Sequence, residues 1–419
     1  MDSQNSIPTS ASGEESRPRL QVHVHRSITE IAESLWDSVS APYGLANTHR
    51  FLTALECSRV EMADYWYLLI HLEDELVGTA VIASFTVSLD LLNSGLHKVV
   101  LPVRRLRPGF LKVRILFSGT PISIGRHNIC SKYQWLDEAI VEQVAQCMDE
   151  IAESERINIL CAKEFPAQSL SRFEPFAKSG FFLAKSMPRV CMTITWPDFG
   201  TYLSSMRAGY RRQITASLRK AEWKQLRPEF ENGSKANTAA TLLHLEHPSR
   251  QVAPIFAALY AQTISRTETK LEILNEQFFS LLFEKCSVDL ELLTLRRKDE
   301  IIGAALLTTH EQTLHFLLAG IDYSLRDRYD TYFNLLSGIV ALAFSRNCGI
   351  VDLGQTSYHA KMRLGGELEE MFFFLKARGR IVHALLRASR RLLFPGVAVD
   401  PRHVFHDMAS LPKVEGANH

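Results

Sequence analysis

The chain has 419 residues, of which 46% are hydrophobic and 22% charged, proportions that are ordinary for a soluble globular protein of two or three domains. Because 47 Lys and Arg stand against 46 Asp and Glu, the formal net charge of +1 excludes a global basic field, and any polyanion binding must come from local patches. The seven cysteines are odd in number and no pair has CxxC spacing. We therefore expect no disulfide framework, no zinc ribbon and no bound metal.

The two ends of the chain carry little folding information. Residues 1–18 are polar and contain no apolar core, which predicts a disordered tail rather than a signal peptide, and residues 396–419 are expected to form a loose tail. The longest apolar runs, such as 335–344, are shorter than the ~20 residues that a membrane span needs. We expect no transmembrane segment and a cytoplasmic location.

The first half of the chain alternates between strand-like and helix-like patterns. A basic, proline-bracketed segment at 96–110 and a glycine-rich loop that ends at Gly125 interrupt the series. Strands are predicted at 20–24, 65–72, 76–89, 113–118, 157–165 and 182–196, and helices at 28–39, 49–57, 133–154 and 169–179.

The second half begins again after Pro197 with a long helix and a polar linker, "ENGSKANTA". Helices are predicted at 202–225, 255–264, 276–285, 331–346 and 380–394, and strands at 227–230, 288–296, 301–310, 313–322, 349–354 and 370–378. We place a domain boundary near Asp198, giving lobes at 19–197 and 198–395. Each half runs from helices to an antiparallel meander, a helix and a further strand pair. This is an α+β pattern of mixed, mostly antiparallel sheets flanked by helices.

Two local patterns resemble a known family. They are "YLSSMRAGYRRQITASLRKAE", which opens the second lobe, and "VDLGQTSYHAKMRLGG" at 351–366. Together with the order of elements over 181–378, they resemble the acyl-CoA N-acyltransferase (GNAT) superfamily, in the two-lobed form of Fem-type aminoacyltransferases and FemAB-like acetyltransferases. The first half agrees in the order of elements alone. The resemblance implies two GNAT-like lobes and acyl transfer to an amine.

One segment departs from the pattern of the superfamily. Most GNAT enzymes hold the CoA pyrophosphate on a glycine-rich loop at a helix N-terminus, whereas this chain reads "GIDYSLRDRYDTYF" there. Arginines pair bidentately with phosphate, so cations are expected to replace the glycine cradle; alternatively, these arginines and Asp327 form a solvated ion pair. The predicted contacts for acyl-CoA, with acetyl-CoA as the simplest donor, are Arg326, Arg328, Tyr329, Arg211 and Arg212.

The stretch 352–366 is the candidate catalytic segment. Gly354 and Gly365 permit a sharp excursion between two apolar strands. Tyr358 and Lys361 are three residues apart and share a face if the segment is helical. The resemblance places this excursion at the acyl-transfer point, where Lys361 would stabilise negative charge on the acyl carbonyl. Alternatively, Lys361 is a surface cation and Tyr358 a core anchor.

Amide formation also needs a group that positions or deprotonates the amine. Asp352 and Asp322, each at a strand end, are the candidates, and Asp352 alternatively caps the turn. His315, His359 and Gln355 are predicted acceptor contacts, although His315 fits a buried sheet residue and His359 an exposed one. Without a G-x-S-x-G elbow or a Cys/His pair, direct transfer is favoured over a covalent intermediate.

The sequence thus predicts an N-acyltransferase that uses acyl-CoA and acts on a small-molecule or peptide amine. Two alternatives stay open. The first is Fem-type transfer from aminoacyl-tRNA, which the near-neutral charge disfavours. The second is a two-lobed binding protein that has lost its chemistry. The basic amphipathic segment 380–394 is expected to pack against the second lobe rather than on anionic lipid.

Overall fold

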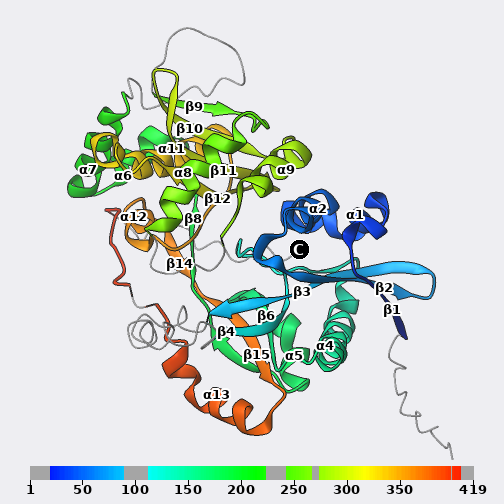
Figure 1. Ribbon diagram of the computed structural model, residues 1–419. Helices are drawn as coiled ribbons and strands as arrows, with labels where there is room; N and C mark the ends of the chain where they lie inside the picture. The colour runs from blue at the N-terminus through cyan, green and yellow to red at the C-terminus, as the bar shows by residue number, and fades with distance from the viewer. Residues whose placement is uncertain (1–18, 89–111, 223–241, 267–272, 398, 407–419) are drawn as a thin grey trace, which may run out of the picture.

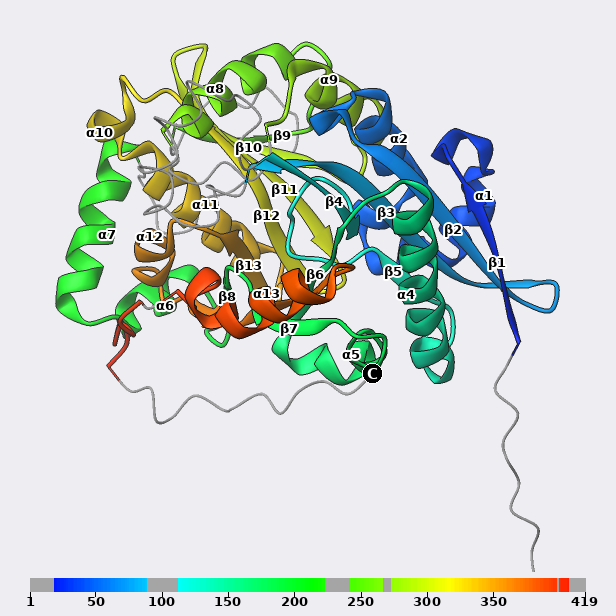
Figure 2. The ribbon, with the colours of Figure 1, turned by 60° about the horizontal axis from the view of Figure 1, so that its bottom comes forward.

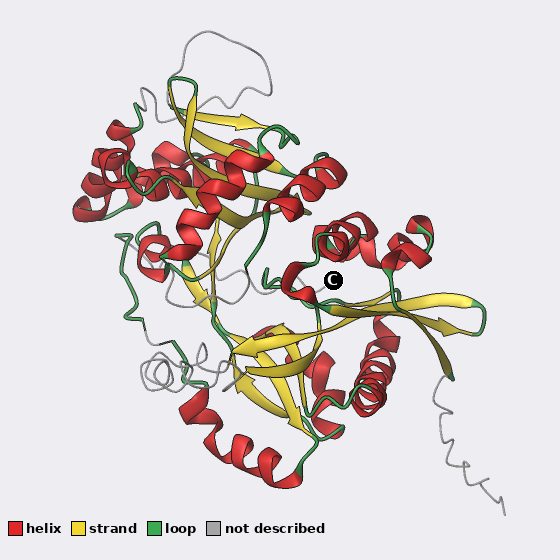
Figure 3. Ribbon diagram, in the orientation of Figure 1, coloured by secondary structure: helices red, strands yellow, loops and turns green. Residues whose placement is uncertain are grey.

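The computed structural model describes residues 19–88, 112–222, 242–266, 273–397 and 399–406. The predicted tail 1–18, the segment 96–110, the strand 227–230, the polar linker and most of the C-terminal tail lie outside these residues. The described chain forms two mixed, mostly antiparallel sheets, each flanked by helices (Figures 1 and 3). The predicted fold class is therefore confirmed.

The first sheet has the strand order β1-β2-β3-β4-β6-β15-β7, with β5 paired to β3. Antiparallel pairing dominates, and the parallel pair is β4 with β6. Its strands are β1 (Leu20–His25), β2 (Asp64–Leu72), β3 (Glu75–Ser88), β4 (Lys112–Ser118), β5 (Ile129–Ser131), β6 (Ile159–Pro166), β7 (Phe182–Lys185) and β15 (Met371–Ala377).

The second sheet has the order β14-β8-β13-β12-β11-β10-β9, with a parallel pair between β12 and β13. Its strands are β8 (Arg189–Thr193), β9 (Leu243–Glu246), β10 (Glu291–Arg297), β11 (Glu300–His310), β12 (Thr313–Ile321), β13 (Ile350–Gln355) and β14 (Glu367–Glu369).

The two sheets exchange one strand in each direction. β8 follows β7 after only residues 186–188, yet it pairs with β13 and β14 of the second sheet. Reciprocally, β15 follows β14 after one residue and lies between β6 and β7 of the first sheet. The single strand predicted at 182–196 is therefore wrong, since Pro188 lacks the N–H that continuous pairing requires. The boundary near Asp198 stays a prediction.

The helices cover the sheets in layers, and one apolar core belongs to both lobes (Figures 1 and 2). In this shared core α2 packs against α9, with the rings of Phe51 and Phe278 edge-on at 6.3 Å.

None of the described helices has both the length and the apolar character needed to cross a membrane. The longer helices are α1 (Glu33–Ser40), α2 (His49–Cys57), α4 (Asp137–Ser154), α6 (Phe199–Ser205), α7 (Ala208–Lys220), α8 (Ala253–Ser265), α9 (Glu276–Cys286), α11 (Thr331–Ser345) and α13 (Arg380–Leu393), and the short ones are α5 (Glu174–Lys178), α10 (Arg326–Tyr329) and α12 (Tyr358–Met362).

Two helix predictions need correction. The long helix predicted at 202–225 is two helices, α6 and α7, because Met206 bridges to Phe405 and the Arg207 N–H donates to the Val404 carbonyl instead of continuing the helix. The basic helix α13 packs on β15 and β7 of the first sheet, not on the second lobe. The exchange of β15 explains this, because it carries the following segment to the first lobe.

The parallel strands β12 and β13 pair over only three residues, from Thr313 with Ile350 to His315 with Asp352. Beyond this point β12 continues to Ile321 without β13 as a partner. Gly354 turns the chain with a φ of +70°, where the pairing of β13 with β8 also breaks register. The last paired residues, His315 and Asp352, therefore mark the place where the two strands part.

The position of β12 depends on close backbone contact with α8. A Cβ atom at Gly320 would lie 2.8 Å from the backbone nitrogen of Tyr260, which cannot move without shifting α8. We expect Gly320→Ala to lower the free energy of unfolding by about 1–3 kcal/mol in urea titrations. Gly209→Ala is the control, since a Cβ there meets nothing within 4 Å and favours helix α7 by up to ~1 kcal/mol. Equal effects of the two changes would contradict the close contact.

Candidate functional site

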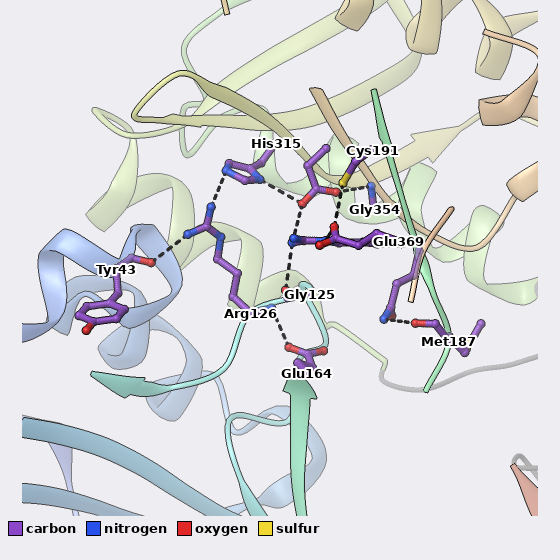
Figure 4. Close-up of polar contacts among 12 residues, drawn as sticks. Tyr43, Gly125, Arg126, Glu164, Met187, Cys191, His315, Gly354 and Glu369 are labelled. Atoms are coloured by element: carbon purple, nitrogen blue, oxygen red, sulfur yellow. Dashed lines mark hydrogen bonds and ion pairs between the residues drawn. The ribbon is translucent and has the colours of Figure 1, made fainter. Parts of the chain in front are cut away.

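A network of buried polar side chains lies where β12 and β13 part, and it includes groups from both lobes (Figure 4). Asp352 is at its centre and is almost fully buried. Its Oδ2 accepts hydrogen bonds from His315 Nδ1 and Arg189 Nη1, both at 3.3 Å, and its Oδ1 accepts one from the Gly354 N–H at 2.9 Å. Burial by itself would raise the pKa of Asp352, but the His315 hydrogen bond, the Arg189 charge and the Gly354 N–H together lower that pKa. The carboxylate is thus ionised and its oxygens are engaged.

Arg189 joins the exchanged strand β8 to this carboxylate. Its Nε donates to Glu369 Oε2 at 2.5 Å, and its Nη1 lies 3.4 Å from the Gly125 carbonyl of the first lobe. The Cys191 thiol donates to the same Glu369 oxygen at 3.3 Å. Burial, followed by the charge of Asp352, raises the pKa of Cys191. This cysteine is therefore a protonated thiol and a poor nucleophile.

Both ring nitrogens of His315 have a polar side chain as partner. Nδ1 meets Asp352, and Nε2 lies 2.8 Å from Arg126 Nη2. Because a guanidinium only donates, Nε2 is the acceptor and the proton resides on Nδ1. Burial lowers the pKa of His315, opposed by Asp352 and assisted by the charge of Arg126. The imidazole is therefore neutral, and its basic nitrogen is capped by an arginine of the other lobe.

Arg126 follows the glycine-rich loop of the first lobe, and its guanidinium is held by neutral acceptors. Nη1 donates to the Tyr43 carbonyl at 3.3 Å, while the backbone N–H of Arg126 donates to buried Glu164 at 3.1 Å. Burial and repulsion from Arg189 lower the pKa of Arg126.

A pocket between the lobes adjoins Arg126 and His315. It opens to solvent, and the empty space within its walls, with the solvent-open part included, is about 360 Å³. No carboxylate is among its lining residues, which are Gly44, Leu45, Ala46, Phe51, Ile124, Arg126, Thr308, His310, His315 and Leu317. Apolar walls with one guanidinium and two imidazoles fit a ligand that has an anionic group and an apolar part.

Lys361 is the second unusual group at the site. Its side chain is 1% exposed, and Nζ donates to the carbonyls of Gly354 at 3.2 Å and Gln355 at 2.5 Å. The ammonium also lies 5.6 Å from the Phe316 ring centroid. Burial lowers the pKa of Lys361 to about 7, although the charge of Asp352 opposes this. Lys361 can therefore exist as a cation or as a neutral amine near neutral pH.

The structure brings some predicted residues together and leaves others apart. Tyr358 donates to the Pro188 carbonyl at 3.1 Å, and Gln355 donates to the Met187 carbonyl at 2.9 Å, so both tie α12 and β13 to the segment before β8. Asp322 lies seven residues beyond His315, roughly 23 Å along an extended strand, and accepts hydrogen bonds from Ser324. His359 is exposed and contacts Arg402.

The predicted donor contacts do not gather at one point. Arg326 pairs with Asp327 at 2.8 Å, and Arg328 lies against the ring of Tyr329. Arg211 donates to the carbonyls of Ser204 and Met206, and Arg212 is exposed. α7 meets α10 through Lys220, whose ammonium lies 2.9 Å from Asp330.

Sequence reasoning missed Arg126, Arg189 and Glu369. Arg189 had a detectable signal, since it follows Pro188 at the start of a strand that is otherwise apolar. Arg126 and Glu369 had no such signal, because the sequence around each of them does not indicate that it lies near residues 315 or 352. Among the described residues, no group of three His, Cys, Asp or Glu side chains is arranged to hold a metal ion.

Comparisons with known proteins give one matching family model. Residues 208–362 match the family model described as "Acetyltransferase (GNAT) domain", a span that contains His315, Asp352 and Lys361. No curated protein sequence matches the chain.

Among solved structures, FemX is 11% identical and superposes with a TM-score of 0.51, covering 88% of this chain and 100% of FemX. The C-terminal domain of a putative lysylphosphatidylglycerol synthetase from Agrobacterium fabrum is 10% identical, with a TM-score of 0.46 and coverage of 90% and 98%. A tandem GNAT protein from the clavulanic acid biosynthesis pathway is 11% identical, with a TM-score of 0.45 and coverage of 86% and 99%. Residues 208–362 thus match a GNAT acetyltransferase domain, and the two-lobed fold is like that of FemX. The resemblance to the two-lobed, FemAB-like GNAT proteins is confirmed.

The lowered pKa of Lys361 has a measurable effect on stability. The unfolded chain, with a lysine pKa near the ordinary value of 10.5, binds this proton more tightly than the folded protein. The buried Lys361 therefore lowers the free energy of unfolding by its full amount below pH about 7. This loss of stability disappears as the pH rises toward 10.5. We expect the stability of wild type relative to Lys361→Met to rise across this range by roughly 3–5 kcal/mol, measured by urea unfolding at each pH. Lys178→Met, at an exposed site, is the control. Parallel pH profiles for wild type and Lys361→Met would contradict the burial of a lysine without an ionic partner.

Proposed function

We propose that this protein is an N-acyltransferase that transfers an acyl group from acyl-CoA, with acetyl-CoA as the simplest donor, directly to an amine. One observation carries the proposal: His315, Asp352 and Lys361 converge at the end of the paired part of β12 and β13, inside the segment that matches the GNAT domain. A parting of parallel strands opens backbone groups to a ligand, and titratable groups with shifted pKa values at such a place are typical of catalytic sites.

The reaction needs one proton acceptor and one group that stabilises the oxyanion. The amine nitrogen attacks the thioester carbonyl, a C–N bond forms, the C–S bond breaks, and the amine proton ends on the CoA sulfur. Lys361 and His315 are the proton-handling candidates, because each has a pKa shifted toward the neutral form. As a cation, Lys361 instead stabilises the developing negative charge. Asp352 is proposed as a positioning residue, since its oxygens already accept from three donors.

The donor is proposed to lie along the part of β12 that pairs with β11 but no longer with β13, from His315 toward α10. His315 and Asp322 are separated by roughly 23 Å along the strand. This length suits CoA, whose phosphates are joined to the thioester by a long extended arm. Arg326 and Arg328 are proposed to hold those phosphates, with α10 brought against α7 by Lys220. The glycine-free turn before α10 supports a site made of cations rather than a backbone cradle.

The donor is tested by calorimetry and by turnover with an amine panel. Purified protein is expected to bind acetyl-CoA and to release one equivalent of free thiol per amide formed. Arg326→Ala combined with Arg328→Ala is expected to weaken CoA binding by about 1.5–3 kcal/mol through loss of a charge-assisted bond. Arg387→Ala combined with Arg391→Ala, in the other lobe, is the control for charge alone. Activity with aminoacyl-tRNA in place of acyl-CoA would overturn the donor assignment, and no activity with either would favour a binding protein.

The acceptor is proposed to be an amine that also carries a carboxylate or another anionic group. The pocket beside His315 offers the guanidinium of Arg126, which has no carboxylate partner among the described residues. An anionic group that binds this guanidinium would draw it from His315 Nε2 and free that nitrogen to accept the amine proton. Binding of the correct acceptor would in this way produce the base.

The proposed acceptor class is tested with paired substrates, an amino acid and its carboxamide. Wild type is expected to prefer the amino acid in kcat/KM, and Arg126→Met is expected to reduce that preference by about tenfold or more, because a charge-assisted pair is lost. Arg126→Lys should restore part of it. Lys163→Met, a lysine whose ammonium meets Ser123 outside the pocket lining, is the matched control. An unchanged preference in Arg126→Met would exclude this role.

A further inference from the structure

The helix α13 lies on the outside of the first lobe (Figures 1 and 2) and packs through only one side. On that side the His383 ring meets Phe182 edge-on at 5.4 Å, and Phe394 just beyond the helix meets Phe373 at 4.9 Å. The Ala377 N–H donates to His383 Nδ1 at 3.2 Å. These contacts fix the orientation of the helix on β15 and β7.

The opposite side of α13 presents large apolar side chains to solvent. Ile381, Leu385 and Leu392 are 77%, 64% and 74% exposed. At 100° per residue these three positions fall within roughly 40° of one another, so they form one continuous row. No residue of α13 is buried. A row of large aliphatic side chains on a folded surface indicates an interaction site.

Arginines line the flank of this apolar row. Arg380, Arg387 and Arg391 recur at spacings of seven and four, which places them on one side of the helix. The helix contains no acidic residue. Within the described part of the chain, none of these three arginines forms an ion pair. The described residues therefore leave the positive charge of these three arginines without an ion-pair partner.

We propose that α13 docks the protein onto a membrane surface that contains anionic lipid. The helix would lie in the plane of the interface, with the row formed by Ile381, Leu385 and Leu392 among the acyl chains and the arginines among the lipid phosphates. Basic amphipathic helices bind bilayers in this manner. Fourteen residues span only about 21 Å, and the helix carries four arginines, so it lies on the bilayer rather than crossing it.

Charge decides between a membrane and a second copy of the chain. Two copies that packed their apolar rows together would bring two sets of arginines into proximity with no acidic residue on either helix to offset them. An anionic lipid surface offsets each arginine individually, by an amount that grows with the number of basic residues. The packing of His383 against the first sheet also leaves the apolar row facing outward, where a flat surface can reach it.

The test is co-sedimentation of the full-length protein with vesicles of phosphatidylcholine alone and of phosphatidylcholine mixed with phosphatidylglycerol. Wild type is expected to bind the mixed vesicles and to be released by salt. Replacing Ile381, Leu385 and Leu392 together by Asp is expected to abolish binding. Replacing Arg380, Arg387 and Arg391 together by Gln is expected to weaken vesicle binding about 10²-fold, since each basic residue near an anionic surface adds a comparable share of the attraction. Val288→Asp, at a position that is 81% exposed elsewhere, is the control and should bind as wild type does.

Circular dichroism of each variant confirms that it is folded, which is expected because the replaced side chains face solvent. Absence of wild-type binding to anionic vesicles, or equal binding by the aspartate variant, would overturn the proposal. Concentration-dependent dimerisation that the aspartate variant abolishes, without vesicle binding by wild type, would assign the row to a second copy instead. This test does not depend on acyltransferase activity, so the two proposals stand or fall separately.

Discussion

The ionised carboxylate of Asp352 is the group on which the arrangement of the site depends. It is buried and accepts from a histidine, an arginine and a backbone N–H, which come from three different strands or turns. Removing this carboxylate would break a buried ion pair and leave Glu369 as the remaining carboxylate partner of Arg189 among the described residues. Asp352 therefore fixes the proton of His315 on Nδ1 and aims Nε2 at the first lobe, whether or not it ever touches a substrate.

The strand exchange supplies Arg189, one of the three partners of this carboxylate, and the groups that contact Arg189 or lie beside it. Arg189 and Cys191 are on β8, which the first half of the chain contributes to the second sheet, and Glu369 is on β14, immediately before the chain crosses back. The lobes are thus held together by backbone pairing as well as by the shared apolar core. A pocket lined from both lobes can keep a defined shape only if the lobes cannot rotate freely, and the exchange meets that condition.

The sequence predicts the fold more completely than the site. Periodicity placed most of the described helices and strands, because an amphipathic pattern is a local property. It failed at Met206 and at Pro188, where pairing with a distant segment ends an element. Asp352 and Lys361 were found through a turn between apolar strands, but Lys361 was expected either at the acyl-transfer point or at the surface, and its ammonium is buried beneath the carbonyls that the turn presents. Arg126 was missed because its contact with His315 joins residues 189 positions apart.

A charge balance links these features to the proposed chemistry. Glu369 and Asp352 offset Arg189, and Asp352 also acts on Lys361 and Arg126. Asp352 thus acts on three basic side chains, all in surroundings that disfavour charge. Burial is the main cause of the lowered pKa values of Lys361 and His315, and the charges of Arg126 and Arg189 add to it for His315. An anion entering the pocket would offset the charge of Arg126 and would raise the affinity of His315 for a proton. Binding an anionic ligand and strengthening His315 as a base are therefore two consequences of the buried positive charge of Arg126.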